Sequence, residues 1–196
     1  MRNPKNAVVR RRPKRGPYDR VLIVCEGSKT EPNYFFDIAR HYELSTANIE
    51  IVGAGADPLT IVKKGKERKQ KERRSGEKYD RVYCVFDRDQ HAHFQQAGVL
   101  AQTSKLQLGR SLPCFEFWLL LHFRFSRHLY GRSQGRSPAQ KCIRDLRQYW
   151  PDNEKARDGV FLQLIDTVEN ADAAIDDGSI GNAIGTAYSV SASPSG

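Results

Sequence analysis

The segment Val21-Leu22-Ile23-Val24-Cys25-Glu26-Gly27 decides the fold class, because five apolar residues run without interruption into an acid and a glycine. An unbroken apolar run of this length is typical of a strand that is buried on both faces of a parallel sheet. A second such run, at residues 79–86, ends in Asp87-Arg88-Asp89. Helical patterns separate the apolar runs, and this alternation predicts an α/β domain with a mostly parallel, doubly wound sheet of about four strands.

Capping residues and apolar spacing predict the remaining elements. Thr30, with Glu31 and Pro32 in the first turn, is expected to cap a helix with an apolar stripe, and Asp57-Pro58 is expected to cap another. Helices are expected on both faces of the sheet. They are predicted from Thr30 to about 42 and over about 58–75, 92–104, 113–125, 138–149 and 159–170, and further strands at 49–52 and 106–108.

The chain divides into four segments by composition. Residues 1–18 combine basic residues and prolines with few large apolar side chains, so we expect a disordered basic arm. Residues 19–125 are the predicted α/β domain. Residues 126–185 are a predicted helical extension packed on it, and residues 186–196 a flexible tail rich in Ser, Ala and Gly.

The net charge of +9 on 196 residues is concentrated in two places. Residues 1–20 hold eight basic residues and one acid, and residues 63–78 hold nine and three, so these stretches carry +13 and the rest carries −4. A local excess favours a polyanionic partner, DNA or RNA. The second stretch is also compatible with a solvated helix face, in which Glu67 pairs with Lys71 and Glu72 with Arg68. The expected nucleic-acid contacts are Lys63, Lys64, Lys66, Arg68, Lys69, Arg73 and Arg74.

Several classes of protein are disfavoured by composition. No run approaches the ~20 apolar residues of a membrane span, and the basic N-terminus lacks the apolar segment of a signal peptide, so a cytoplasmic protein is expected. The four cysteines form no Cys-x-x-Cys pair, which favours free buried thiols over a zinc site.

Acids follow two of the predicted strands at the point where each strand ends. Glu26 follows the first, and Asp87 and Asp89 follow the third. Parallel strands end at the same edge of a sheet, so these three carboxylates are expected to converge at the edge where α/β sheets bind ligands. Their mutual repulsion is relieved by a hard divalent cation, and oxygen-only ligands favour Mg²⁺ or Mn²⁺.

Six further residues are candidates with alternative roles. Lys29 either binds a phosphate or is a solvated side chain, and Glu31 either joins the metal ligands or stabilises the start of its helix. Glu116 either supports the metal site or caps its helix. His122 is interpreted as structural. A mixed His/Asp metal site including His91 and His93 is disfavoured, because side chains two residues apart on a helix diverge.

Three blocks of this chain resemble the RloB-like family in order and spacing, over roughly residues 18–185. They are VCEGSKTEPNYF at 24–35, FDRD at 86–89 and PCFEFWLLLHF at 113–123. RloB-like proteins resemble Toprim domains, which implies that Glu26 is the Toprim glutamate and that Asp87 and Asp89 are the metal-binding pair. Two departures are Leu112, where the resemblance leads us to expect Asn, and a C-terminal tail without the family's closing strand or helix.

The resemblance also implies an activity. The family is associated with restriction-modification and phage-defence loci, often beside an ABC-type ATPase, so we expect a metal-dependent nuclease that hydrolyses phosphodiester bonds of DNA or RNA. The expected catalytic residues are Glu26, Lys29, Asp87, Asp89 and Glu116. One alternative is a non-catalytic subunit that recruits nucleic acid to the ATPase. Another is nucleotidyl transfer, as in primases.

Overall fold

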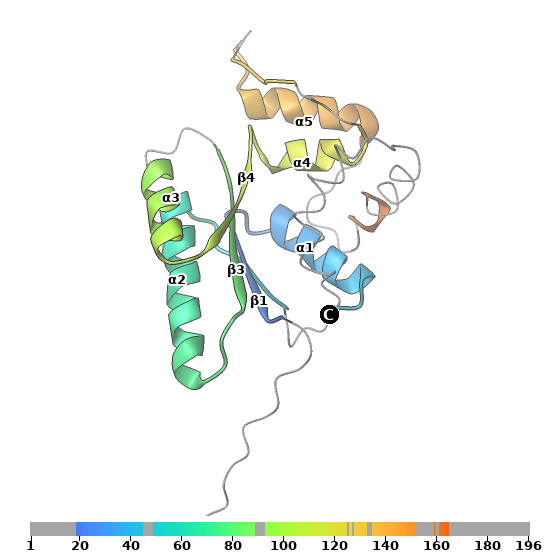
Figure 1. The fold of residues 1–196 in the computed structure, drawn as a ribbon. Helices are drawn as coiled ribbons and strands as arrows, with labels where there is room; N and C mark the ends of the chain where they lie inside the picture. The colour runs from blue at the N-terminus through green and yellow to red at the C-terminus, as the bar shows by residue number, and fades with distance from the viewer. Residues whose placement is uncertain are drawn as a thin grey trace, which may run out of the picture.

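Four parallel strands form the centre of the molecule. The computed structural model describes residues 19–44, 49–88, 93–124, 126, 128–132, 135–151, 159 and 161–164. The strands are β1 (Val21–Cys25), β2 (Ile49–Gly53), β3 (Arg81–Asp87) and β4 (Gln107–Ser111), in the order β2-β1-β3-β4 (Figure 1). Every neighbouring pair is parallel. This sheet confirms the α/β class and is consistent with a Toprim-like, doubly wound fold.

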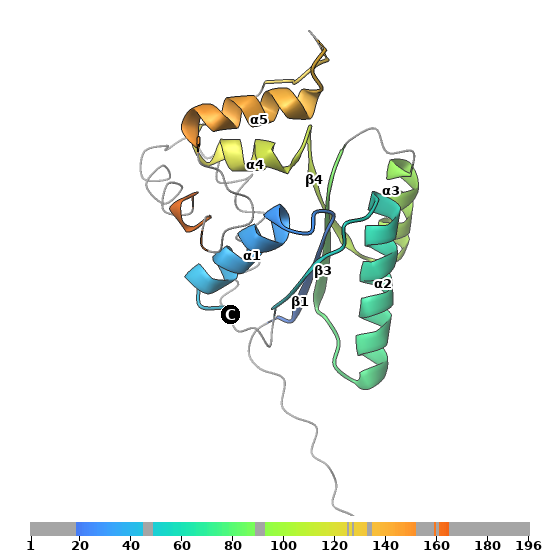
Figure 2. The ribbon, with the colours of Figure 1, turned by 180° about the vertical axis from the view of Figure 1, so that it is seen from behind.

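Helices cover both faces of the sheet. α2 and α3 lie on one face of the sheet, and α1 lies on the other face (Figures 1 and 2). α4 and α5 lie beyond one end of α1. The bounds are α1 Thr30–His41, α2 Pro58–Ser75, α3 Phe94–Thr103, α4 Phe115–Leu121 and α5 Pro138–Tyr149.

The side chains of β1 alternate between two cores, which explains its uninterrupted apolar sequence. Val21, Ile23 and Cys25 join the core under α1, α4 and α5. Leu22 and Val24 join the core under α2 and α3. All five are buried, as expected of a strand covered on both faces.

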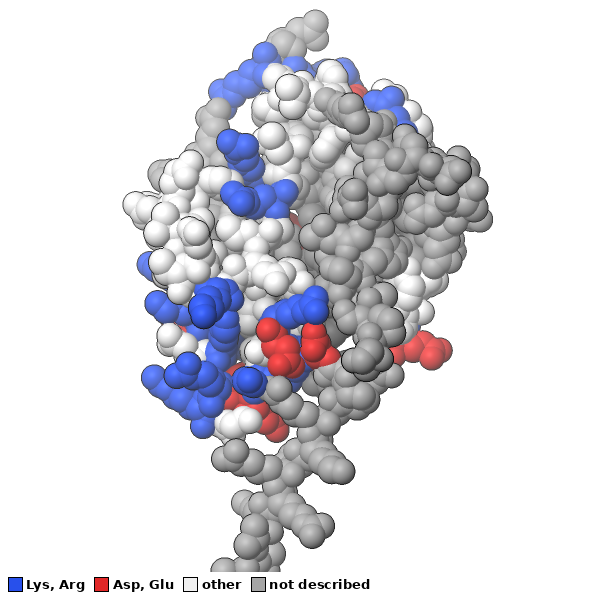
Figure 3. All heavy atoms as spheres, in the orientation of Figure 1, with Lys and Arg blue, Asp and Glu red and all other residues white. Residues whose placement is uncertain are grey.

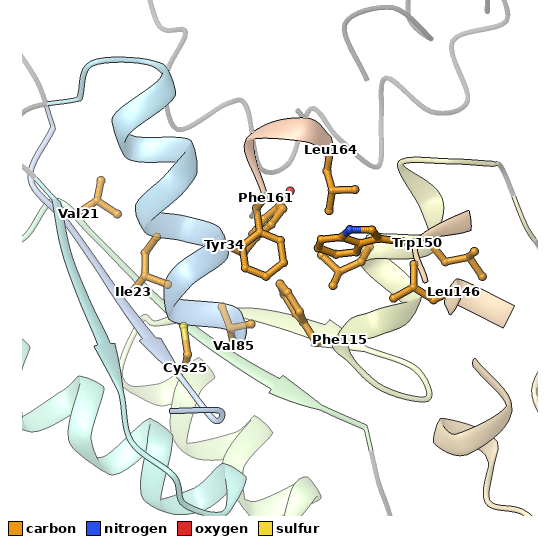
Figure 4. Close-up of a cluster of buried hydrophobic side chains, with 12 residues drawn as sticks. Val21, Ile23, Cys25, Tyr34, Val85, Phe115, Leu146, Trp150, Phe161 and Leu164 are labelled. Carbon is orange, nitrogen blue, oxygen red and sulfur yellow. The ribbon is translucent and has the colours of Figure 1, made fainter. Parts of the chain in front are cut away.

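The C-terminal part of the described chain packs on the α1 face. Phe161 and Leu164 belong to the same core as Tyr34, and Figure 4 shows Tyr34, Phe161 and Trp150 gathered in it. The buried carboxylate of Asp37 on α1 accepts hydrogen bonds from the backbone N–H groups of Gly159 and Phe161, at 3.1 Å each. α1 therefore binds a segment that lies more than 120 residues later in the chain.

Some predicted boundaries were wrong. Lys29, not Thr30, occupies the N-cap position of α1, without a side-chain capping bond. α4 ends at Leu121 instead of near 125, and β4 extends to Ser111 instead of ending at 108. α5 matches the predicted 138–149, and residues 162–164 form one helical turn of the expected 159–170 helix. The predicted arm 1–18 and tail 186–196 lie outside the described residues. Within the described residues, no helix is long and apolar enough to cross a membrane.

Candidate active site

The strand order reverses between β1 and β3, and the candidate site lies at the carboxyl ends of these two strands. The chain passes from β1 to β2 on one side and then returns to place β3 on the other. In open α/β sheets such a switch point is the usual location of a ligand site. Glu26 follows β1 there, and Asp87 ends β3.

A direct hydrogen bond joins these two positions. The backbone N–H of Asp87 donates to Oε2 of Glu26 at 2.9 Å, and the backbone N–H of Glu26 donates to the carbonyl of Val85 at 2.8 Å. The structure thus brings Glu26 and Asp87 together as their positions after parallel strands predicted. Asp89 lies outside the described residues.

Ser111 on β4 orients the Asp87 carboxylate. Its hydroxyl donates to Oδ1 of Asp87 at 2.9 Å, and the two residues are register partners in the sheet. No sequence pattern marks Ser111 as a site residue, because the register of a weakly apolar edge strand is set by its pairing with the neighbouring strand. Such partners fix the orientation of a metal-binding carboxylate.

Two more acids lie within electrostatic range of Asp87. Glu31 and Glu116 are both buried, in the first turns of α1 and α4. Burial first, and then the charges of Glu26, Glu31 and Glu116, raise the pKa of Asp87 to about 7, against the lowering effect of the Ser111 hydroxyl. Glu26, Glu31, Asp87 and Glu116 therefore form one group of interacting carboxyls, the acidic cluster. Membership of this cluster is one of the two roles that the sequence leaves open for Glu31 and for Glu116.

Glu31 also stabilises the turn between β1 and α1. Its Oε1 accepts a hydrogen bond from the N–H of Gly27 at 3.2 Å. A Cβ at Gly27 would lie 1.9 Å from Oε2 of Glu31, so a larger residue here would require the Glu31 carboxylate to move. Burial raises the pKa of Glu31, with further contributions from the charges of Glu116 and Glu26.

The acidic cluster has the donor chemistry of a hard cation site. Carboxylates that raise each other's pKa are stabilised as anions when a cation lies between them, and their oxygens suit Mg²⁺ or Mn²⁺. Within the part of the chain that the structure describes, no three His, Cys, Asp or Glu side chains already stand at metal-holding spacing. Glu26 and Asp87 are the two acids at the carboxyl ends of β1 and β3, between which the switch point lies.

The histidines and Lys29 occupy other positions. Lys29 is exposed in the turn that begins α1. His122 is buried, and its Nε2 lies 3.0 Å from the hydroxyl oxygen of Tyr34, which agrees with its structural interpretation. His93 precedes α3, whereas His91 lies outside the described residues.

Most of the basic stretch lies on α2, which leads away from the acidic cluster. Its first turn lies at the carboxyl edge of the sheet, whereas Glu72 near its end contacts Arg20, just before β1. Figure 3 shows basic side chains gathered over the lower part of α2. Arg73 and Arg74 are therefore at the opposite edge of the sheet from Asp87.

Two basic residues of α2 have internal partners. Arg68 forms an ion pair with Glu50 on β2, and Glu72 forms one with Arg20. These two ion pairs are present in place of the Glu72–Arg68 pair expected from the sequence. Nζ of Lys69 donates to the carbonyls of Ser104 and Lys105 at 3.1 and 2.7 Å. Lys69 thus caps the C-terminal end of α3, and its charge is partly used within the fold.

A comparison with protein families identifies the chain. The family described as RloB-like protein matches residues 21–191, which is most of the sequence and includes both Glu26 and Asp87. The chain belongs to the RloB-like family. A comparison with curated proteins found no match.

Proposed function

We propose that this RloB-like protein is a metal-dependent nuclease that hydrolyses phosphodiester bonds of DNA or RNA. The observation that carries the proposal is the acidic cluster: Glu26 and Asp87 in contact at the switch point, with Glu31 and Glu116 close enough to raise the pKa of Asp87. A cluster of this kind at a ligand-binding edge favours metal chemistry, and the local basic excess favours a polyanionic substrate.

Each acid has a role in this proposal. Glu26, Asp87 and Asp89 would hold Mg²⁺ or Mn²⁺, which when bound polarises a phosphoryl oxygen and lowers the pKa of a bound water. Ser111 keeps the Asp87 carboxylate oriented through its 2.9 Å hydrogen bond. Glu26 alternatively moves a proton, and Lys29 on the exposed β1–α1 turn contacts a substrate phosphate. Glu31 and Glu116 add negative charge that increases cation affinity.

The test is cleavage of labelled single-stranded DNA, duplex DNA and RNA by the purified chain, with Mg²⁺ or Mn²⁺ and with EDTA. Asp87→Asn and Glu26→Gln should each lower the cleavage rate more than ~100-fold, because each removes a metal ligand. Both should keep the thermal stability and nucleic-acid affinity of the wild type. Burial and the neighbouring acids raise the pKa of the Asp87 carboxyl, and an uncharged amide at this position relieves both effects, so loss of folding is not expected.

Glu67→Gln is the matched control, because it neutralises an exposed acid on α2. Its cleavage rate should equal that of the wild type. Full activity in Asp87→Asn, or cleavage that persists in EDTA, would show that the acidic cluster is not the catalytic site.

The exposed basic residues of α2 favour one second candidate, a subunit that binds nucleic acid without cutting it. In that case the chain recruits DNA or RNA to an ABC-type ATPase in a defence system. Binding of nucleic acid without metal-dependent cleavage by the purified chain, followed by cleavage or ATP hydrolysis only after addition of the ATPase, would select this candidate.

A further inference from the structure

Two arginines, Arg88 and Arg110, lie at the carboxyl ends of β3 and β4, on the face of the sheet opposite the Asp87 carboxylate. Phe86 and Arg110 are register partners, as are Asp87 and Ser111. Side chains alternate along a strand, so Asp87 and Ser111 share one face while Phe86 and Arg110 share the other. Arg88 follows Asp87 directly and its backbone N–H donates to the carbonyl of Ser111 at 2.7 Å, which keeps it beside β4.

Both guanidinium groups lie close to the same aromatic ring. Cζ of Arg88 and Cζ of Arg110 each lie 5.8 Å from the centroid of the Phe94 ring. Phe94 begins α3 and packs edge-on against Phe86 with ring centroids 5.8 Å apart. Cation–π contacts of this length favour these positions of the arginines, so both groups lie on the same side of the strand ends.

The two arginines make an exposed concentration of positive charge. Both side chains are exposed, and neither has a carboxylate partner among the described ion pairs. Figure 3 shows basic side chains where β3 and β4 end, apart from those over the lower part of α2. Two like charges against one ring repel each other, and an anion bound between them relieves that repulsion.

We infer that Arg88 and Arg110 form a phosphate-binding pair that holds the substrate strand beside the acidic cluster. The inference rests on the proposed function for the identity of the strand. Asp87 and Arg88 are consecutive residues at the end of β3, and their side chains lie on opposite faces of the sheet. Because the two side chains are so close along the chain, the arginine pair binds a backbone phosphate next to the one that reacts. Guanidinium groups suit this task, because their planar fork matches phosphate oxygens.

Phe94 is a positioning residue in this arrangement. Its ring contacts both arginines and does not itself need to contact the substrate. Phe94→Leu retains apolar packing against Phe86 but removes the cation–π contacts. It should therefore weaken binding less than removal of the arginines does.

The test measures binding and cleavage separately. Binding of a fluorescent 12-nucleotide DNA or RNA strand is measured in EDTA, where metal-dependent cleavage is absent. Arg88→Gln/Arg110→Gln should weaken binding roughly tenfold or more, since each arginine donates charged hydrogen bonds to phosphate. The slope of log affinity against log salt concentration should fall by about one. In Mg²⁺ the same variant should raise KM and leave kcat within a few-fold of the wild type.

Lys78→Gln/Arg147→Gln is the matched control. It removes two charges from exposed positions, in the loop before β3 and in the last turn of α5. Arg110→Lys should keep more affinity than Arg110→Gln. Equal binding by the control and the Arg88/Arg110 variant, or absence of binding by the metal-free wild type, overturns the inference. If the wild type binds but never cleaves, the proposed activity fails, and the binding data still decide whether this pair holds phosphate.

Discussion

At the scale of single residues, burial shifts the titration of two side chains in opposite directions. It raises the pKa of Asp87 to about 7, and it lowers the pKa of His122 to about 4. The cause is the same, because burial disfavours the charged form of either group. For Asp87, neighbouring acids add to the effect, as expected where a cation binds. For His122, the outcome is a neutral ring in contact with Tyr34.

The His122 shift predicts a loss of stability in acid. The pKa in the folded protein is below the ordinary value of 6.5, so the unfolded chain binds more protons between pH 6.5 and pH 4. The contribution to stability is fully present above pH 6.5 and is lost as the pH falls toward 4. Urea unfolding at pH 7 and pH 4 should show that the wild type loses about 3 kcal/mol more than His122→Gln does. Equal losses in the two proteins would mean that His122 does not titrate differently in the folded and unfolded states.

At the scale of elements, the start of α2 has a well-formed N-cap. The carboxylate of Asp57 accepts hydrogen bonds from the backbone N–H groups of Leu59 and Thr60, at 3.0 and 3.4 Å. Asp57→Ala should lower the free energy of unfolding by about 1 kcal/mol, because these N–H groups lose their partner. Asp57→Asn retains the acceptor oxygen and should lie within about 0.5 kcal/mol of the wild type. Denaturant unfolding of the three proteins at pH 7 checks this, and equal destabilisation by Ala and Asn would assign the effect to charge.

The same helix shows which elements could be predicted from the sequence. Its cap is local, in Asp57-Pro58, and so is its end, where Gly76 adopts a left-handed φ of 90°. β4 was predicted too short because Gly109 and Arg110 carry little strand signal, and pairing with β3 is what makes them a strand. α4 was predicted too long because the apolar sequence continues to Phe123, beyond the last helical residue, Leu121.

From the sequence we could predict only those residues of the candidate site whose location in the fold follows directly from their location in the chain. Glu26 and Asp87 end parallel neighbouring strands, so their proximity follows from the topology. The roles of Ser111, Arg110 and Lys69 depend on contacts across elements: β4 against β3, β4 against α3, and α2 against α3. No local pattern marks such contacts, and the basic run of α2 therefore looked uniform although Arg68 and Lys69 have partners inside the fold.

At the scale of the whole molecule, the charges are arranged along α2. The acidic cluster lies at the carboxyl edge of the sheet, and α2 carries basic side chains from that edge to the opposite one. An 18-residue helix is about 27 Å long, which is the length of roughly 8 base pairs. A long nucleic acid at the acidic cluster therefore has room to follow the exposed residues Lys63, Arg73 and Arg74.

This arrangement predicts a dependence on substrate length. Arg73→Gln/Arg74→Gln should weaken binding of a 20-base-pair duplex roughly tenfold, with a salt slope smaller by about 2, because two phosphate contacts are lost. Binding of a 6-nucleotide strand should be unchanged, because such a strand at the acidic cluster does not reach the end of α2. Fluorescence anisotropy over 50–200 mM salt measures both. Equal weakening for the short and the long substrate would place the nucleic acid across the amino edge of the sheet and away from Asp87.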